Sequence, residues 1–261
     1  MEDVRAKKRL GQHFLTDMGI AQDIVEALSP QTARVLEIGP GMGVLTQFLL
    51  QKENLEVHAV ELDEESVAYL NQHYPELQPR LYSMDFLKAD LLSMIQPPFS
   101  IIGNFPYNIS SQILFRVLDY KDQIPEVVGM FQKEVAVRIA SKPGNRDYGI
   151  LSVLLQAYYD IEYLFTVHEH VFNPPPKVKS AVIRLRRNAC RRLPCDEATW
   201  KMLIKTAFNQ RRKTLHNSLK NISFEDGFTQ NEIFRKRPEQ LGVDEFVYLT
   251  QHVNEQFTIN N

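Results

Sequence analysis

The chain has 261 residues, of which 44% are hydrophobic and 24% charged, with 30 basic residues against 32 acidic ones. These values are ordinary for a globular protein and argue against disorder, and no apolar run approaches the ~20 residues of a membrane span. No apolar stretch of a secretory signal follows the N-terminus, and Cys190 and Cys195 cannot form a disulfide framework or a four-ligand zinc site. We therefore expect a cytoplasmic protein that has either one large domain or one domain with a smaller appendage.

The formal net charge of −2 conceals a strong asymmetry along the chain. The segment from Lys177 to Lys220 contains 13 basic residues and only two acidic ones, Asp196 and Glu197, so it carries +11. The other 217 residues carry −13. Such segregation indicates a polyanionic partner, although a solvated basic face would explain it equally well.

Short apolar strands alternate with helical patterns from about residue 20 to residue 187. The elements that we predict, in chain order, are a helix at Ile20–Leu28, a strand at Ala33–Ile38, a helix ending near Gln51, a strand at Glu56–Leu62, a helix at Glu64–His73, strands at Arg80–Met84 and Phe99–Gly103, a helix at Ile109–Leu118, a strand at Glu126–Gln132, a helix at Lys133–Ser141, and strands at Ile161–Val167 and Val178–Arg186. This alternation predicts an α/β domain with a mostly parallel sheet covered on both faces. The last two strands follow each other without a helix and should form an antiparallel edge.

A polar stretch at residues 187–196 marks a change in pattern. We predict an α/β domain over residues 1–190 and a small all-helical domain over residues 195–261. The first helix of the second domain carries an apolar stripe at helical spacing, formed by Trp200, Leu203, Ile204, Ala207 and Phe208. A second, mostly basic stripe on the same predicted helix is formed by Lys201, Lys205, Asn209 and Arg212.

Polar residues and glycines follow the first three predicted strands. Gly39, Gly41 and Gly43 lie between a strand and a helix, where glycines allow a tight turn and let backbone N–H groups approach a ligand. Glu61 ends the second strand, at a position suited to ribose hydroxyls, and Asp85 follows the third, where an adenine would lie. A structural turn is the alternative for the glycines alone, but the three features together favour a nucleotide-type site.

The segment Asn104-Phe105-Pro106-Tyr107 follows the fourth predicted strand. An exocyclic adenine amine is a poor nucleophile because its lone pair is delocalised into the ring. The Asn104 side-chain oxygen and a backbone carbonyl beside Pro106 could accept its two hydrogens, and Tyr107 offers a face for the base. A surface turn is the alternative for this segment in isolation.

Taken together, these motifs resemble the S-adenosylmethionine-dependent ribosomal RNA adenine N6,N6-dimethyltransferases, and most closely the bacterial small-subunit branch linked to kasugamycin resistance. The strings that carry the resemblance are Lys8 to Leu15, Glu37 to Thr46, Glu61 to Asp63, Asn104 to Ser110, Gln132 to Val135, Tyr148-Gly149, Phe172 to Leu185 and Ala207 to Leu215. The resemblance covers nearly the full chain and implies a Rossmann-like class I methyltransferase sheet.

The resemblance also implies a cofactor, a substrate and the residues that hold them. S-adenosylmethionine would be the co-substrate, and no metal would be needed. The substrate would be two adjacent adenines in the 3′-terminal hairpin loop of 16S rRNA in the pre-30S subunit. The protein would act as a monomer. The residues implied in cofactor binding are His13, Leu15, Gly39, Gly41, Glu61, Asp85 and Asn104. Catalysis falls on Asn104, Pro106 and Tyr107.

Contacts with substrate RNA are expected from Tyr107, Phe172, Lys177, Arg211, Arg212 and Lys213. Phe172 would be a second stacking face for the base, and a core aromatic is its alternative. Lys7, Lys8 and Arg9 are expected to order over the substrate or cofactor, or else to form a frayed tail. His168 and His170 lack the pattern of a third metal ligand, so we interpret them as a surface strand end.

Two departures from the family pattern are visible. The family often has Asn where this chain has His13, and Leu where it has Phe105, a change that could alter the pocket width. Two other functions stay open at this point: methylation of an adenine in large-subunit rRNA, and a non-catalytic RNA-binding assembly factor that keeps the fold.

Overall fold

The computed structural model describes residues 4–254 and divides the chain into two compact units. Unit 1 comprises residues up to 136 together with 160–187, and unit 2 comprises 137–159 together with the residues from 188 onward. This division differs from the predicted domains in the segment 137–159, which joins the helical unit. The outer ends of the two predicted domains, residues 1–3 and 255–261, lie outside the described residues.

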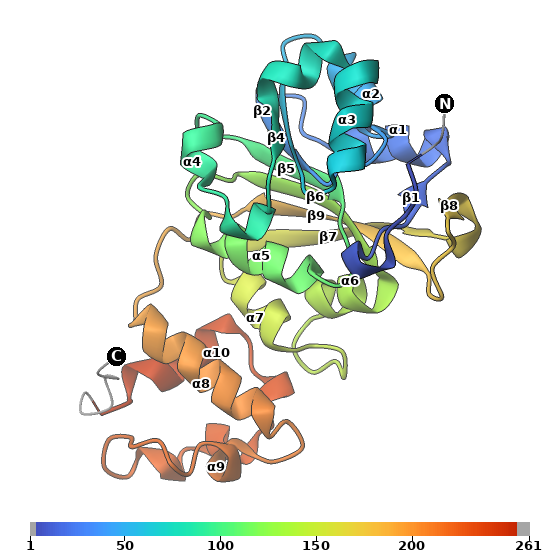
Figure 1. Cartoon of the computed structure of the whole chain (residues 1–261). Coiled ribbons are helices and arrows are strands. Elements are labelled where there is room, and N and C mark those ends of the chain that lie inside the picture. Colours follow the sequence, from blue (N-terminus) through green and yellow to red (C-terminus); the bar gives the residue numbers. More distant parts are fainter. Residues whose placement is uncertain (1–3, 255–261) are drawn as a thin grey trace. The chain divides into compact units, whose positions relative to one another are not determined.

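Unit 1 is built on a seven-stranded sheet with the order β4-β3-β2-β5-β6-β9-β7 (Figure 1). Its strands are β2 (Arg34–Ile38), β3 (Glu56–Glu61), β4 (Leu81–Ser83), β5 (Ser100–Asn104), β6 (Glu126–Gln132), β7 (Tyr159–Val167) and β9 (Ser180–Arg187). The five strands from β4 to β6 are parallel, and β9 runs antiparallel to β6. The predicted mostly parallel sheet with an antiparallel edge is confirmed.

The helices of the α/β part connect these strands. They are α1 (Met18–Glu26), α2 (Thr46–Leu50), α3 (Glu64–His73), α4 (Leu91–Met94), α5 (Ser110–Asp119) and α6 (Lys133–Ala140), with the 3₁₀ turns η1 (Lys8–Leu10), η2 (Pro75–Arg80), η3 (Phe86–Lys88) and η4 (Glu169–Val171). The central parallel strands β2 and β5 are almost completely buried, which is why they appear in the sequence as continuous apolar runs. The carboxyl ends of β2, β3 and β5 consequently meet at one edge.

One small sheet was not predicted. β1 (Phe14–Leu15) pairs antiparallel with β8 (Phe172–Asn173), and Leu15 lies opposite Phe172. Figure 1 shows these two strands side by side, although they are far apart in the sequence. Two-residue strands leave no periodic signal, so only tertiary pairing reveals them.

The Phe105 ring occupies the core beside two glycines that face each other across β5 and β6. Gly103 lies opposite Gly129, and Phe105 packs edge-on against Phe131 with ring centroids 5.0 Å apart. Phe105 is 1% exposed, and a Cβ on Gly129 would lie 2.2 Å from its ring. The ring fills space made by the glycines and also lines a cavity of unit 1, so its larger size bears on core packing as well as on pocket width.

Unit 2 consists of helices and 3₁₀ turns from both of its chain segments. Its helices are α7 (Ile150–Gln156), α8 (Glu197–Asn209), α9 (Leu215–Ser218) and α10 (Val243–Gln251), with 3₁₀ turns η5 (Phe228–Gln230), η6 (Glu232–Arg235) and η7 (Pro238–Gln240). The predicted apolar stripe of α8 is buried in its core, which confirms the helical pattern. The helix ends at Asn209, however, so Arg212 lies in the following turn and the predicted basic stripe stops before it. None of the helices within residues 4–254 is long and apolar enough to cross a membrane.

We expect Gly129→Ala to destabilise the protein by about 1–3 kcal/mol, the usual effect of inserting a methyl group into a packed core. Phe105→Leu should relieve part of this loss, because it removes the ring that the new methyl group would meet. Chemical denaturation of the two single variants and the double variant measures this coupling. Strictly additive effects would contradict the packing argument.

Candidate functional site

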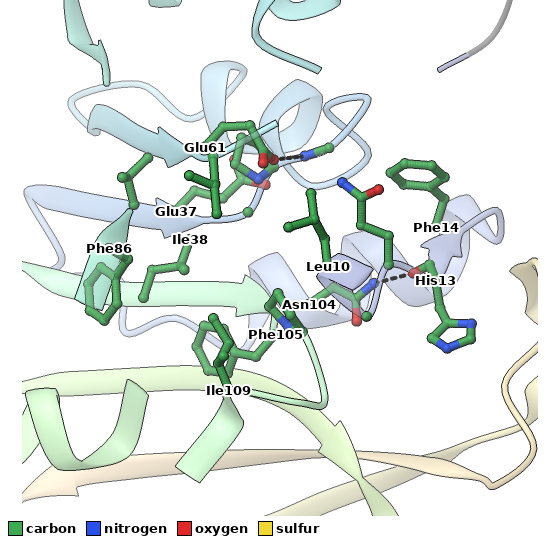
Figure 2. Close-up of a pocket in the computed structure, with 18 of the residues that line it drawn as sticks. Leu10, His13, Phe14, Glu37, Ile38, Glu61, Phe86, Asn104, Phe105 and Ile109 are labelled. Atoms are coloured by element: carbon green, nitrogen blue, oxygen red, sulfur yellow. Dashed lines mark hydrogen bonds between the residues drawn. The ribbon is translucent and has the colours of Figure 1, made fainter. Parts of the chain in front are cut away.

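A cavity opens in unit 1 where the parallel strands end (Figure 2). Five chain segments line it: residues 10–15, the turn after β2, the end of β3, the start of η3, and the segment after β5. This location follows from the topology, because loops after parallel strands converge at one edge of the sheet. Side chains that are distant in sequence are thereby brought into one space.

Glu61 connects the glycine turn to the end of β3. Its carboxylate accepts the Gly41 N–H at 3.0 Å and the Asp63 N–H at 2.9 Å, one on each oxygen. The turn has positive φ at Gly39 (66°), Gly41 (57°) and Gly43 (82°), a conformation that side chains disfavour. At Gly41 a Cβ would also lie 2.9 Å from the Phe14 ring. The turn therefore requires glycine at position 41, and the Glu61 carboxylate holds its backbone N–H.

Glu61 is 6% exposed, and burial raises its pKa even though the backbone hydrogen bonds oppose this. A second acid, Glu37, lies fully buried at the end of β2 and accepts the Thr46 hydroxyl at 2.7 Å. Burial raises the pKa of Glu37 to about 8, and the nearby Glu61 charge adds to this rise. Glu61 was predicted to bind a ligand, whereas Glu37 was given no role of its own, because nothing in the pattern showed that its carboxylate would be enclosed.

Asp85 lies across the cavity from the glycine turn. Its carboxylate accepts the Leu87 N–H at 2.9 Å and so caps η3. The buried ring of the next residue, Phe86, also lines the cavity. The Asp85 carboxylate at the start of η3 and the Phe86 ring therefore line the same cavity, and such a combination of a polar group and an apolar surface suits an aromatic ligand.

Asn104 points into the cavity from the end of β5, with its orientation set by a single contact. The amide nitrogen donates to the His13 carbonyl at 2.9 Å, as Figure 2 shows. A carbonyl can only accept, so this contact directs Nδ2 toward His13 and leaves Oδ1 available as an acceptor. The Pro106 carbonyl accepts the Ile109 N–H at 3.2 Å and keeps a second lone pair.

Tyr107 is held at the other side of Asn104. Its hydroxyl hydrogen-bonds to Ser180 of β9, and its ring stacks with that of His13 at a centroid distance of 5.4 Å. His13 Nδ1 lies 2.8 Å from the Pro174 carbonyl, so Nδ1 carries the hydrogen. His13 thereby contributes its carbonyl to Asn104 and its ring to Tyr107.

Residues 7–16, which we call the strap, run across the edge of the sheet above these groups. At one end Lys7 pairs with Asp63 and Glu65, and Gln12 donates to Asp63 at 3.4 Å. At the other end the Thr16 N–H donates to the Val171 carbonyl at 2.8 Å, next to the β1–β8 pairing. The strap is therefore tied down on both sides of the cavity.

The Asp63 carboxylate is the anchor of the first end. It is 2% exposed, and burial by itself would raise its pKa. Hydrogen bonds from Lys7, Ser66 and Gln12 outweigh that effect and lower the pKa, so the carboxylate is charged at neutral pH. Of the three basic residues, Lys7 is held by Asp63 and Glu65, while Lys8 and Arg9 lie exposed in η1.

The structure brings most of the predicted site residues together. Those that line the cavity are His13, Leu15, Gly39, Gly41, Glu61, Asp85, Asn104, Pro106 and Tyr107. Phe172 does not line it: it is 4% exposed and belongs to the hydrophobic core, in agreement with the core-aromatic alternative. Lys177 is exposed in unit 1, and Arg211, Arg212 and Lys213 lie in the turn after α8 in unit 2.

His168 and His170 lie at the end of β7 with ring centroids 5.8 Å apart. Over residues 4–254, the structure contains no group of three or more His, Cys, Asp or Glu side chains that could hold a metal ion. Cys190 and Cys195 are both free thiols.

Comparisons with known proteins agree with this site. Residues 4–250 match the family model described as ribosomal RNA adenine dimethylase. "Ribosomal RNA small subunit methyltransferase A" of Cytophaga hutchinsonii is 60% identical over 252 residues, covering 96% of this chain and 98% of the relative. The protein of the same name from Bacteroides thetaiotaomicron is 58% identical, covering 98% of this chain and 96% of the relative.

Two solved structures resemble the chain. A dimethyladenosine transferase from Plasmodium falciparum superposes with a TM-score of 0.76 at 25% identity, covering 91% of this chain and 96% of its own. The 23S rRNA methyltransferase ErmE superposes with a TM-score of 0.65 at 25% identity, covering 92% of this chain and all of its own.

We expect Lys7→Ala to loosen the strap, because it removes the cation that pairs with a buried carboxylate. Amide hydrogen exchange over residues 10–15 should become faster. Lys8→Ala is the matched control, since Lys8 is exposed and has the same charge. Equal exchange in the two variants would contradict the anchor.

Glu37 should make stability depend on pH. Its pKa is raised in the folded state, so the folded protein retains a proton that the unfolded chain loses between about pH 4.5 and pH 8. Stability from this group is therefore lost as the pH rises through that window and stays constant above it.

Glu37→Gln removes the titration, so the stability of the variant relative to wild type should rise from pH 5 to pH 8. The change should be on the order of 2–4 kcal/mol, since one pKa unit corresponds to ~1.4 kcal/mol. Urea denaturation of both proteins across this range measures it. A difference independent of pH would show that Glu37 is ionised in the folded state.

Proposed function

The chain belongs to the ribosomal RNA adenine dimethylase family, and we propose that it transfers methyl groups from S-adenosylmethionine to N6 of two adjacent adenosines in 16S rRNA. The substrate would be the 3′-terminal hairpin loop of the pre-30S subunit, and the product N6,N6-dimethyladenosines formed in the cytoplasm. The observation that carries this proposal is the Asn104 Oδ1 acceptor, which faces a cavity that also contains Glu61 and Asp85.

The cavity has the donors and acceptors that S-adenosylmethionine requires. Each Glu61 oxygen accepts one backbone N–H and keeps a lone pair for a ribose hydroxyl. Asp85 and the Phe86 ring would bind the adenine, and the turn at Gly39 and Gly41 allows a ligand to approach the backbone closely. The co-substrate supplies a methyl group on a sulfonium, so the reaction needs no metal.

Asn104 and Pro106 would prepare the target amine. Two acceptors, Asn104 Oδ1 and a backbone carbonyl beside Pro106, would take its two hydrogens and favour a pyramidal nitrogen with its lone pair directed at the methyl group. Tyr107 would stack on the base, which must leave its neighbours in order to react. Positioning supplies much of the rate in such a reaction, so no strong base is required.

RNA binding would rest on exposed cations. Lys177 in unit 1 and Arg212 and Lys213 in unit 2 would neutralise rRNA phosphates, and Arg211 precedes these two cations in the same turn. We propose that residues 195–261 form an rRNA-binding domain and that the protein acts as a monomer. An RNA loop suits this site because bases leave their stack more readily there.

The alternative substrate is large-subunit rRNA, because ErmE has a similar structure. The relatives named for the small subunit are 56–60% identical to this chain, compared with 25% for ErmE, and we therefore favour the small subunit. A non-catalytic assembly factor is disfavoured because Asn104, Pro106 and Tyr107 all line the cavity.

Labelled S-adenosylmethionine, incubated with unmethylated 30S or 50S subunits, tests the proposal. We expect labelling of the 30S subunit only, and mass spectrometry should map it to two adjacent adenosines. Labelling of the 50S subunit alone would establish the large-subunit alternative. Binding without any methyl transfer would establish the assembly factor.

Asn104→Ala should lower kcat by about 10²–10³-fold, the usual loss when one acceptor or donor at the reacting group is removed. Cofactor affinity should change much less, because the acceptor acts on the target amine. Single-turnover kinetics and calorimetry separate the two effects. A greater loss of affinity than of turnover would refute this role.

Glu61→Ala should show the opposite pattern. It removes the ribose acceptor and also the carboxylate that holds the Gly41 and Asp63 N–H groups. Cofactor affinity should fall at least tenfold, the loss of about one or two charged hydrogen bonds. Unchanged affinity by calorimetry would count against the ribose role.

A further inference from the structure

The cations of the turn after α8 do not all have the same environment. Arg211 is turned toward its own unit: its guanidinium donates to the Arg146 carbonyl, and Nε lies 4.0 Å from the Glu239 carboxylate. Arg212 and Lys213 are exposed, and within residues 4–254 neither takes part in an ion pair. Arg211 therefore has internal partners, whereas its two neighbours face solvent.

Both partners of Arg211 are connected with one loop: Arg146 is part of it, and Glu239 accepts a hydrogen bond from it. Residues 142–147 connect α6 to the segment before α7, and the Gly144 N–H donates to the Glu239 carbonyl at 2.7 Å. Arg211 binds the same loop two residues further on, at the Arg146 carbonyl. The loop is thus fixed at two points against η7 and the α8 turn, all within unit 2.

This arrangement adds two cations to those of the turn. Lys142 is exposed, and the side chain of Arg146 is 94% exposed, with only Asp147 nearby at 4.0 Å. The loop and the turn together carry five cations, Lys142, Arg146, Arg211, Arg212 and Lys213. Asp147 lies 4.0 Å from Arg146 and Glu239 lies 4.0 Å from Arg211, so these seven residues have a net charge of +3. Lys142 and Arg146 lie outside the basic segment that the sequence displays, so only the fold joins them to it.

We propose that the loop at residues 142–147 is a second RNA-binding element, in which Arg146 and Lys142 contact phosphates beside Arg212 and Lys213. Arg211 is then a positioning residue that holds the loop through the Arg146 carbonyl. The inference rests on the proposed function, which supplies RNA as the polyanion. A phosphate backbone suits this surface because exposed cations bind it without a shaped pocket.

Salt dependence tests the loop directly. Binding of the full chain to unmethylated 30S subunits and to free 16S rRNA is measured over a range of KCl concentrations. Arg146→Gln should weaken binding severalfold and lower the salt slope by about one, the effect of losing one phosphate contact. Arg235→Gln, an exposed change on η6 of the same unit, should leave both unchanged.

Double variants test the position of Arg211. Arg146→Gln and Arg212→Gln should have additive effects, because each cation makes its own contact. Arg146→Gln and Arg211→Gln should be non-additive, because loss of Arg211 already releases the loop. Additive effects in this second pair would make Arg211 a phosphate ligand itself and overturn its positioning role. Cofactor affinity is expected to stay at the wild-type value in each of these variants.

The outcomes separate this inference from the proposed function. Methyl transfer to 30S subunits together with a wild-type salt slope in Arg146→Gln would overturn the loop assignment alone. A reduced slope in Arg146→Gln, with no methyl transfer by the wild type to either subunit, would support the loop and overturn the proposed substrate.

Discussion

The Glu61 carboxylate is the constraint on which the cavity depends. One of its oxygens holds the Gly41 N–H, and the other holds the Asp63 N–H. Three glycines in left-handed conformation are thereby fixed beside the end of β3, and Asp63 is placed where Lys7 and Gln12 of the strap reach it. The same carboxylate thus shapes the floor of the cavity and, through Asp63, supports its cover.

The strap connects the Asp63 end of the cavity with Asn104 and Tyr107. The strap carries the His13 carbonyl to Asn104 and the His13 ring to Tyr107. A backbone carbonyl from residues 7–16 therefore decides which atom of Asn104 faces the cavity. The strap's role is orientation as well as enclosure, and both of its ends are held: one by Asp63 and Glu65 at the start of α3, the other by Val171 and β8.

Much of this was predictable from the sequence, and the failures have physical causes. Buried parallel strands and the apolar stripe of α8 are visible in composition and periodicity. The mostly parallel sheet with its antiparallel edge and the burial of Trp200 therefore followed from the pattern, whereas the strand order did not. Phe172 was ambiguous because an aromatic residue suits both a core and a stacking face, and only its pairing opposite Leu15 decides. The Lys7–Asp63 and Arg211–Arg146 contacts join residues more than 50 positions apart, and no local pattern reports such pairs.

The central claim is that Asn104 Oδ1 and a backbone carbonyl beside Pro106 accept the two hydrogens of an adenine amine. A crystal structure of the protein with a non-reactive cofactor analogue and an adenosine nucleotide tests it most directly. We predict that N6 lies at about 2.9 Å from both oxygens, the ordinary hydrogen-bond distance, with the base stacked on Tyr107. An adenine whose N6 lies away from Asn104, or a base that does not contact Tyr107, would contradict the account.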